Sequence, residues 1–276
     1  MIRTLQRDEA RIVLYEDEYS RRIRVDDYSG QPKAVFELIE RSLPSWTEKL
    51  IVKARPADIN FFLHHGFSEE AMIAGYFSGT DMHFLTRYPN PARTQSTKAK
   101  EEDQIIQRLL STPQASGPAP EVKIEFATPA DAGALAALYG ECFEVYPTPV
   151  NNPEHVRKTM DDGTVYAVIR DNNRIISAAS AEINETYRNA ELTDCATRAG
   201  HEGKGLIRAL LQELERHLQS RGIKCLYTIA RSESFGMNKA FYQLGYKFGG
   251  RMTKNCMIYS GLEDMNVWYK FENSVI

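Results

Sequence analysis

The chain has 276 residues, of which 42% are hydrophobic and 26% charged, and its formal net charge is −3. This is the balance of a globular protein long enough for two domains, and so small a charge excludes a surface-wide field that would recruit nucleic acid. The charged start MIRTLQRDEAR excludes a secretory signal, and no apolar run approaches the roughly 20 residues that span a bilayer.

The cysteines and histidines give no sign of a metal or redox site. Cys142, Cys195, Cys225 and Cys256 lie far apart in the sequence, and no pair of histidines has metal-ligand spacing. We therefore expect reduced structural thiols, no metal and a cytoplasmic location.

Residues 1–88 form the first predicted domain. Alternating and helical spacing of apolar residues predicts two short strands within 11–28, a helix over 32–43, a strand at 50–54, a helix at 57–65, and strands at 71–76 and 82–87. Three arginines, Arg21, Arg22 and Arg24, lie along the second strand, and we expect them to form a solvated face rather than a binding patch.

Residues 89–120 are the predicted boundary between two domains. They begin with PNPAR and end with STPQASGPAP, and a short, highly charged helix is expected between these two segments. Proline and small polar residues at both ends favour an exposed linker over a core element.

Residues 121–276 form the second predicted domain. Its expected elements are a strand at 122–126, helices at 128–139 and 151–160, a hairpin of 165–170 and 175–183, a strand at 190–197, a helix at 205–219, a strand at 224–230, a helix at 237–244, and strands near 256–259 and 266–271. Strands and helices alternate in both domains, which indicates an α/β protein with a mixed sheet.

The stretch AELTDCATRAGHEGKGLIRALL, which begins at Ala190, predicts a strand that turns through glycines into a helix. Such a turn leaves backbone N–H groups unpaired at the positive end of the helix dipole, and Lys204 adds a cation, so the turn suits a phosphate or pyrophosphate. An ordinary flexible turn is the alternative, because neither common glycine-rich nucleotide signature is present.

The two predicted domains share five features in the same order. Among them are a strand followed by Ala-Arg (49–55 and 224–231), an apolar helix with a glycine stop (61–67 and 240–246), and Asp-Met before an aromatic strand (from Asp81 and from Asp264). The first domain therefore looks like a copy of only the second half of the later one. It lacks the glycine turn, so we expect it to supply packing surface or a substrate-site wall and to bind no cofactor. Coincidence between two α/β segments is the alternative.

Several motifs resemble those of the GNAT acyltransferases and, among them, the β-lysine N-acetyltransferases. The strand AELTDCAT, the turn HEGKGL and the helix ending LGY resemble the superfamily, whereas YPTP, YTIARS, GMN, EDMNVWYK and the N-terminal DYSGQ, EKLIVKARPADI and AGYF resemble the family. The resemblance covers nearly the whole chain except the linker. It implies a GNAT fold in the second domain, with a half-GNAT-like first domain, and splayed strands that admit the pantetheine of acetyl-CoA.

The resemblance also implies the reaction, which is transfer of an acetyl group from acetyl-CoA to the side-chain amine of β-lysine. The product, Nε-acetyl-β-lysine, is a compatible solute used against osmotic stress, and a lysine 2,3-aminomutase would supply the β-lysine. The expected partners are therefore small molecules, without nucleic acid or membrane, and a homodimer stays open.

Glu191 is the general base that the resemblance implies, because it matches the position of the catalytic glutamate in GNAT histone acetyltransferases. A base is needed because the pKa of a primary ammonium is near 10.4, so exposing its lone pair at neutral pH costs roughly 4–5 kcal/mol. An ordinary carboxylate is a weak base for this step, so a raised pKa or a water relay is expected. Asp194, three residues on, is expected on the opposite face of the strand, where it would bind a substrate ammonium or orient another group.

The glycine turn is where the resemblance places the pyrophosphate of acetyl-CoA. Its usual pattern is broken at both ends, which weakens affinity without abolishing binding because the donors are backbone groups. The expected cofactor-binding residues are Thr197, Gly203, Lys204, Gly205, Leu206, Ile207 and Ser234.

Three further residues are assigned by place in the fold. Tyr242 is the candidate acid for the leaving thiolate, although Phe241 occupies the usual tyrosine position. Arg231 is the candidate for the substrate carboxylate, and Tyr146 on the YPTP loop is expected to line the pocket.

Three other functions stay open. The first is acetylation of another small amine or amino acid, such as lysine or a polyamine. The second is a non-enzymatic acyl-CoA sensor, which Glu202, Ile207 and Phe241 suggest because they depart from the usual pattern. The third is a protein or histone acetyltransferase, which the match at Glu191 suggests.

Overall fold

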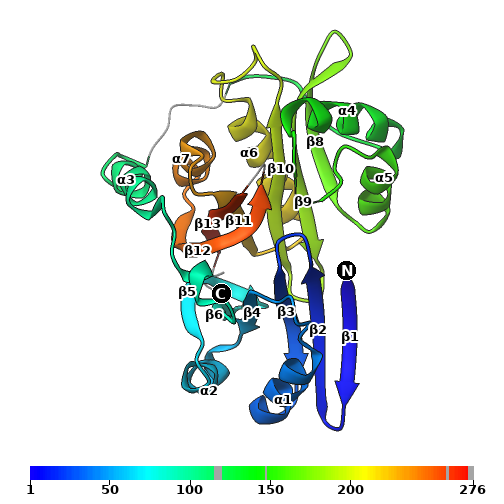
Figure 1. Ribbon diagram of the computed structural model, residues 1–276. Helices are drawn as coiled ribbons and strands as arrows, with labels where there is room; N and C mark the ends of the chain where they lie inside the picture. Colours follow the sequence, from blue (N-terminus) through cyan, green and yellow to red (C-terminus); the bar gives the residue numbers. More distant parts are fainter. Residues whose placement is uncertain (115–119, 147, 259–260, 273–276) are drawn as a thin grey trace.

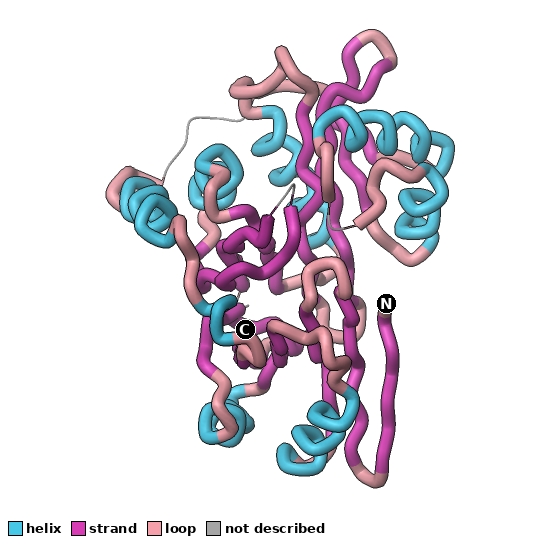
Figure 2. Tube along the Cα trace, viewed as in Figure 1, coloured by secondary structure: helices cyan, strands magenta, loops and turns pink. Residues whose placement is uncertain are grey.

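The computed structural model describes residues 1–114, 120–146, 148–258 and 261–272. Among these residues a single mixed sheet runs through the molecule, with helices on its faces (Figures 1 and 2). The strands are β1 (Ile2–Arg7), β2 (Ala10–Asp17), β3 (Arg22–Ser29), β4 (Lys49–Ala54), β5 (Ser68–Phe77), β6 (Thr80–Arg87), β7 (Ile124–Phe126), β8 (Val165–Asp171), β9 (Arg174–Asn184), β10 (Asn189–Thr197), β11 (Cys225–Arg231), β12 (Lys247–Ile258) and β13 (Gly261–Phe271).

The α-helices are α1 (Pro32–Ser42), α2 (Ile59–His64), α3 (Ala99–Leu110), α4 (Ala132–Cys142), α5 (Pro153–Asp161), α6 (Leu206–Ser220) and α7 (Phe235–Gln243). None of the helices within the described ranges is long and apolar enough to cross a membrane. The alternation of strands and helices confirms the predicted α/β class with a mixed sheet.

The strand order repeats between the two halves of the sheet. The full order is β1-β2-β3-β4-β6-β5-β12-β13-β11-β10-β9-β8-β7, so β2-β3-β4-β6-β5 runs in the same relative order as β9-β10-β11-β13-β12. In each set a hairpin leads through a helix to a parallel strand pair, β3 with β4 and β10 with β11. The N-terminal half therefore has the topology of the second part of the C-terminal half.

Two glycines make the junction between the halves, where β12 pairs with β5 at Gly250 and Ala71. A Cβ on Gly250 would lie 2.3 Å from the carbonyl oxygen of Glu70, and a Cβ on Gly249 would lie 2.3 Å from that of Met72. Only residues without side chains allow the two strands to approach this closely.

Four main cores hold the helices to the sheet and the halves to each other. One core lies under α1 and α2, and two cores lie under opposite helix pairs of the C-terminal half, with Leu210 and Leu214 of α6 in one and Leu135 and Tyr139 of α4 in the other. The fourth core is built from both halves and contains the side chains of Ile51, Ile73, Tyr76, Phe84, Tyr227, Met252 and Val267.

The expectation of an exposed linker is wrong for α3. Ile106 and Leu109 are buried in the same core as α6 and α7, because the two residues share one face of the charged helix. Residues 115–119 of the predicted linker lie outside the described residues, as does Pro147 of the YPTP loop. Strand β1 was not predicted from the sequence; most of its residues are exposed, so it lacks a buried alternating face.

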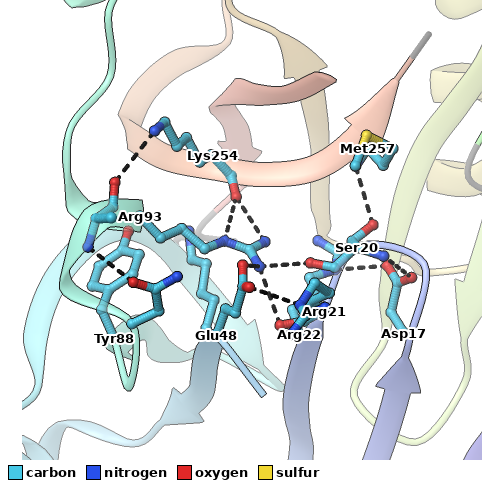
Figure 3. Close-up of polar contacts among 12 residues, drawn as sticks. Asp17, Ser20, Arg21, Arg22, Glu48, Tyr88, Arg93, Lys254 and Met257 are labelled. Carbon is cyan, nitrogen blue, oxygen red and sulfur yellow. Dashed lines mark hydrogen bonds and ion pairs between the residues drawn. The ribbon is translucent and has the colours of Figure 1, made fainter. Parts of the chain in front are cut away.

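Arg93, just after β6, ties the β2–β3 hairpin to β12 (Figure 3). Its buried guanidinium donates to the carbonyl of Ser20 at 2.6 Å and to that of Lys254 at 2.9 and 3.1 Å. The Ser20 hydroxyl oxygen in turn accepts from the backbone N–H of Met257 at 3.1 Å. These contacts hold the hairpin against the C-terminal half and so fix one wall of the site.

Candidate active site

A cavity of about 1260 Å³ lies where β10, β11, the glycine turn and the start of α7 meet the β2–β3 hairpin. It is lined by most of the residues that the sequence singled out, namely Tyr146, Glu191, Asp194, Thr197, Gly203, Lys204, Gly205, Leu206, Ile207, Arg231 and Ser234. The structure thus gathers residues from distant segments into one site.

Strands β10 and β11 separate along this cavity. They pair in parallel only from Asn189 to Glu191, and the residues that follow on both strands line the cavity instead. The separated edges leave backbone N–H and C=O groups without a strand partner, which suits an extended, amide-containing chain that binds as an added strand. This is the splay that the resemblance implied for pantetheine.

The glycine turn closes one end of the cavity and starts α6. Gly203 and Gly205 have φ values of +72° and +76°, a left-handed conformation that favours glycine. The backbone N–H groups of residues 203–207 make no hydrogen bond to any described residue, and all five residues line the cavity. These donors, the helix dipole and Lys204 give the turn the geometry and charge that suit an anion.

Two glutamates face each other across the strands at the other end of the cavity. Glu191 of β10 lies directly opposite Glu182 of β9, and both line the cavity. Glu182 cannot be singled out from the sequence alone, because the pairing register is what brings it beside Glu191. The sequence does show a glutamate in the strand that precedes the strand of Glu191, and this is the signal that could have pointed to Glu182.

Asp194 lies on the same face of β10 as Glu191, so the expectation of opposite faces is wrong. The register of β10 shifts between Thr193 and Ala196, and Asp194 has a φ of +47°. This β-bulge reverses the alternation, so that Leu192 packs under α6 whereas Ala196 packs under α4. The Asp194 carboxylate accepts from the hydroxyl of Ser180 at 2.9 Å.

The pKa values of these carboxyl groups are raised by their surroundings. The Glu182 side chain is open to the cavity, yet burial by the surrounding protein and the charges of Glu191 and Asp194 raise its pKa to about 7. Burial also raises the pKa of Glu191, although Arg24 and Lys53 oppose the shift. Neighbouring carboxylates of this kind titrate as a group, and a group that titrates near neutral pH can accept a proton from an amine.

Tyr146 sits beside Asp194 as a wall of the cavity. Burial, together with the nearby Asp194 carboxylate, raises the pKa of the tyrosine well above its usual value. Its ring stacks on Phe143, with ring centroids 4.5 Å apart. The stacking on Phe143 therefore fixes the Tyr146 ring beside Asp194 on the bulge.

Arg231 lines the cavity, but its guanidinium is bound by Glu263. The Nε and Nη2 atoms of Arg231 donate to the two carboxylate oxygens of Glu263 at 2.6 and 2.8 Å. A substrate carboxylate would compete with this bidentate pair, so the geometry weakens the prediction that Arg231 binds it. Ser234, immediately before α7, also lines the cavity.

Tyr242 lies away from the cavity, and its predicted role as general acid has no support in the structure. Its hydroxyl donates to the carbonyl of Thr112 at 2.7 Å, and its ring lies against Trp268. Tyr242 and its neighbour Phe241, which occupies the position where the superfamily's tyrosine is expected, both lie in the core between α7 and the sheet.

The arginines of β3 are not the solvated face that the sequence suggested. Arg22 is buried and pairs with Asp17 at 2.9 Å, and both Arg22 and Arg24 line the cavity together with Tyr15 of β2. Their role could not be predicted, because it depends on how the N-terminal hairpin docks on the C-terminal half. Among the described side chains, no group of three His, Cys, Asp or Glu residues is placed to hold a metal ion.

Comparison with known proteins places this geometry in a family. The family model described as "Acetyltransferase (GNAT) family" matches residues 133–246. N-acetyltransferase YodP of Bacillus subtilis is 36% identical over 98% of this chain and 99% of its own length. Beta-lysine N(6)-acetyltransferases of Methanosarcina mazei and Methanococcus maripaludis are 35% and 31% identical, over 74% and 80% of this chain and 83% and 82% of their own lengths.

These relatives confirm the resemblance that the sequence motifs indicated. The chain is an acetyl-CoA-dependent N-acetyltransferase that belongs to the β-lysine acetyltransferase family of the GNAT superfamily.

Proposed function

We propose that the chain transfers the acetyl group of acetyl-CoA to the side-chain amine of β-lysine and releases Nε-acetyl-β-lysine. The names of two relatives and the acidic end of the cavity support this substrate. A diamine needs one carboxylate to accept a proton and others to hold its second ammonium. Three carboxylates share one face of β9 and β10, namely Glu182, Glu191 and Asp194.

In the proposed mechanism Glu191, coupled to Glu182, takes a proton from the substrate ammonium. The amine nitrogen then attacks the thioester carbonyl carbon, the C–S bond breaks, and CoA leaves as a thiolate while the nitrogen gives up its second proton to water. A free thiol has a pKa near 8.5, so water can protonate the leaving sulfur without a dedicated acid. Asp194, which accepts a hydrogen bond from Ser180 and lies beside Tyr146, binds the ammonium that does not react.

For the other substrate, we propose that the pyrophosphate of acetyl-CoA binds at residues 203–207 and that pantetheine lies along β10 up to Thr197. The unpaired backbone N–H groups of the turn and the separation of β10 from β11 support this placement. Ser234 at the start of α7 would contact the same chain.

We further propose that residues 1–88 are a half-copy of the catalytic domain, 121–276, joined to it through residues 89–120. The repeated strand order supports this division. In a cell the product would serve as a compatible solute under osmotic stress, and a lysine 2,3-aminomutase would supply the substrate in the cytoplasm.

The proposal is tested by mixing the purified protein with acetyl-CoA and an amine and measuring free thiol. Release that is fastest with β-lysine, compared with α-lysine and spermidine, supports the proposed substrate. Release that is fastest with another of these amines assigns a different substrate to the same chemistry. Bound acetyl-CoA without thiol release above background would contradict catalysis and favour the sensor.

A further inference from the structure

The repeat places a second pair of side chains in register with the two glutamates. In the C-terminal half Glu182 pairs with Glu191, and Glu191 pairs with Tyr227 of β11. In the N-terminal half Tyr15 pairs with Arg24, and Arg24 pairs with Ile51 of β4. Counted from the shared Ala-Arg ends of β4 and β11, Ile51 corresponds to Tyr227, so Arg24 corresponds to Glu191 and Tyr15 to Glu182.

The two pairs face the same cavity with opposite chemistry. Tyr15, Arg24, Glu182 and Glu191 all line it. Arg24 is near enough to Glu191 to oppose the rise in its pKa, yet these two described residues form no direct ion pair. One end of the space between the two halves is therefore acidic, and the other presents a guanidinium and a phenol ring.

Arg24 retains hydrogen-bonding capacity toward a ligand. Its Nε and Nη2 atoms donate to the Asp26 carboxylate at 2.5 and 3.2 Å, which fixes the plane of the guanidinium. Its Nη1 atom donates to no residue in the described part of the chain. The Tyr15 ring lies 5.0 Å from the guanidinium carbon, which limits its motion further.

We propose that Tyr15 and Arg24 form a carboxylate subsite. In it, Nη1 of Arg24 binds the carboxylate of an amino-acid substrate whose reacting amine lies at Glu191. This inference rests on the proposed function and assigns specificity to the N-terminal half-copy. Arg24 is better suited than Arg231, whose Nε and Nη2 are engaged by Glu263, and than Arg22, which is buried against Asp17.

The test compares two substrates that differ only in the carboxylate. β-Lysine and 1,4-diaminopentane are assayed with the full-length wild-type protein and with Arg24→Gln, Arg24→Lys and the control Arg11→Gln. Arg11 is an exposed arginine on β2 that does not line the cavity. The measured quantity is the ratio of kcat/KM for β-lysine to kcat/KM for 1,4-diaminopentane, because any change in the base affects both substrates alike.

Arg24→Gln is expected to lower this ratio roughly 10- to 100-fold, mainly through KM for β-lysine, since a hydrogen-bonded charge is lost. Arg24→Lys should lower the ratio less. A lysine ammonium keeps the positive charge, but it cannot make both the two hydrogen bonds to Asp26 and a hydrogen bond to the substrate carboxylate. Arg11→Gln should leave the ratio unchanged. A wild-type ratio in both Arg24 variants would overturn the subsite.

Failure of the proposed function is distinguishable from failure of this inference. If wild-type protein does not acetylate β-lysine but acetylates α-lysine, the same ratio is measured for α-lysine against 1,5-diaminopentane. A fall in that ratio in the Arg24 variants supports the subsite even though β-lysine is not the substrate, and an unchanged ratio overturns it. Because Arg24→Lys retains the charge beside Asp26, it serves if Arg24→Gln does not fold.

Discussion

The two halves of the sheet share a strand order but differ at the few positions that carry chemistry. In the C-terminal half the glycine turn before α6 has N–H groups that no described residue pairs, whereas in the N-terminal half α1 begins directly at Pro32, which has no N–H to offer. The glutamate pair of β9 and β10 is replaced by Tyr15 and Arg24. The comparison teaches that strand topology supplies a scaffold, while the turn and one cross-strand pair decide what the scaffold does.

The shared core and the glycine junction explain how a half without a glycine turn still contributes to the site. Residues of both halves pack together around Ile51 and Tyr227, and Gly250 lets β12 approach β5. Arg93 fixes the hairpin that carries Tyr15 and Arg24. The N-terminal half is therefore held as a rigid wall opposite the glutamates.

The largest effect is expected from removing the base that only the C-terminal half has. Glu191→Gln should lower kcat roughly 100- to 10,000-fold, because general base catalysis contributes about that much. The measurement is steady-state thiol release with saturating acetyl-CoA. Glu185→Gln, on the exposed turn between β9 and β10, is the control. A loss of less than threefold in Glu191→Gln would remove the distinction between the two halves.

The glycine turn is tested by adding one methyl group. Gly205→Ala places an L-residue at a φ of +76° and puts its Cβ 3.3 Å from Pro120, which costs roughly 1–2 kcal/mol unless the turn moves. A shifted turn misplaces its N–H groups, so KM for acetyl-CoA should rise roughly 5- to 30-fold. Gly133→Ala in α4, where nothing lies within 4 Å of the added Cβ, should leave KM unchanged. Equal KM values in both variants would contradict an anion site at the turn.

The paired glutamates predict the pH dependence. The proposed base, Glu191, must be deprotonated to act. Burial raises its pKa, and the facing Glu182 has a pKa raised to about 7, so kcat/KM should rise with pH through neutrality as the pair loses its protons. Glu182→Gln removes the negative charge opposite Glu191, so the pKa of Glu191 falls. The rising limb of the plot of kcat/KM against pH should then move to lower pH by on the order of one unit. A limb that stays in place would show that the two carboxyl groups are not coupled.

The smallest effect on catalysis is expected at Tyr242. Tyr242→Phe loses only the hydrogen bond to Thr112, so kcat should stay within twofold, while the free energy of unfolding falls by about 1 kcal/mol. Thermal denaturation and thiol release measure the two quantities. A tenfold fall in kcat with normal stability would restore Tyr242 as the acid.

The sequence was sufficient to predict the glycine turn, the strand that bears Glu191 and the repeated pattern, because all three depend on local spacing. It was insufficient where one residue of β10 is inserted against β9. That bulge moves Asp194 to the face of Glu191, and alternation alone predicts the reverse. It was also insufficient for Glu182, Arg24 and α3, whose surroundings are set by pairing register and docking between distant segments.

The central claim is that the C-terminal half acetylates β-lysine at its side-chain nitrogen, using Glu191. The most direct measurement is NMR identification of the product that wild-type protein and Glu191→Gln form from acetyl-CoA and β-lysine. We predict acetylation of the ε nitrogen alone by the wild-type protein and almost none by the variant. Acetylation of the β nitrogen, or equal product from both proteins, would contradict the account.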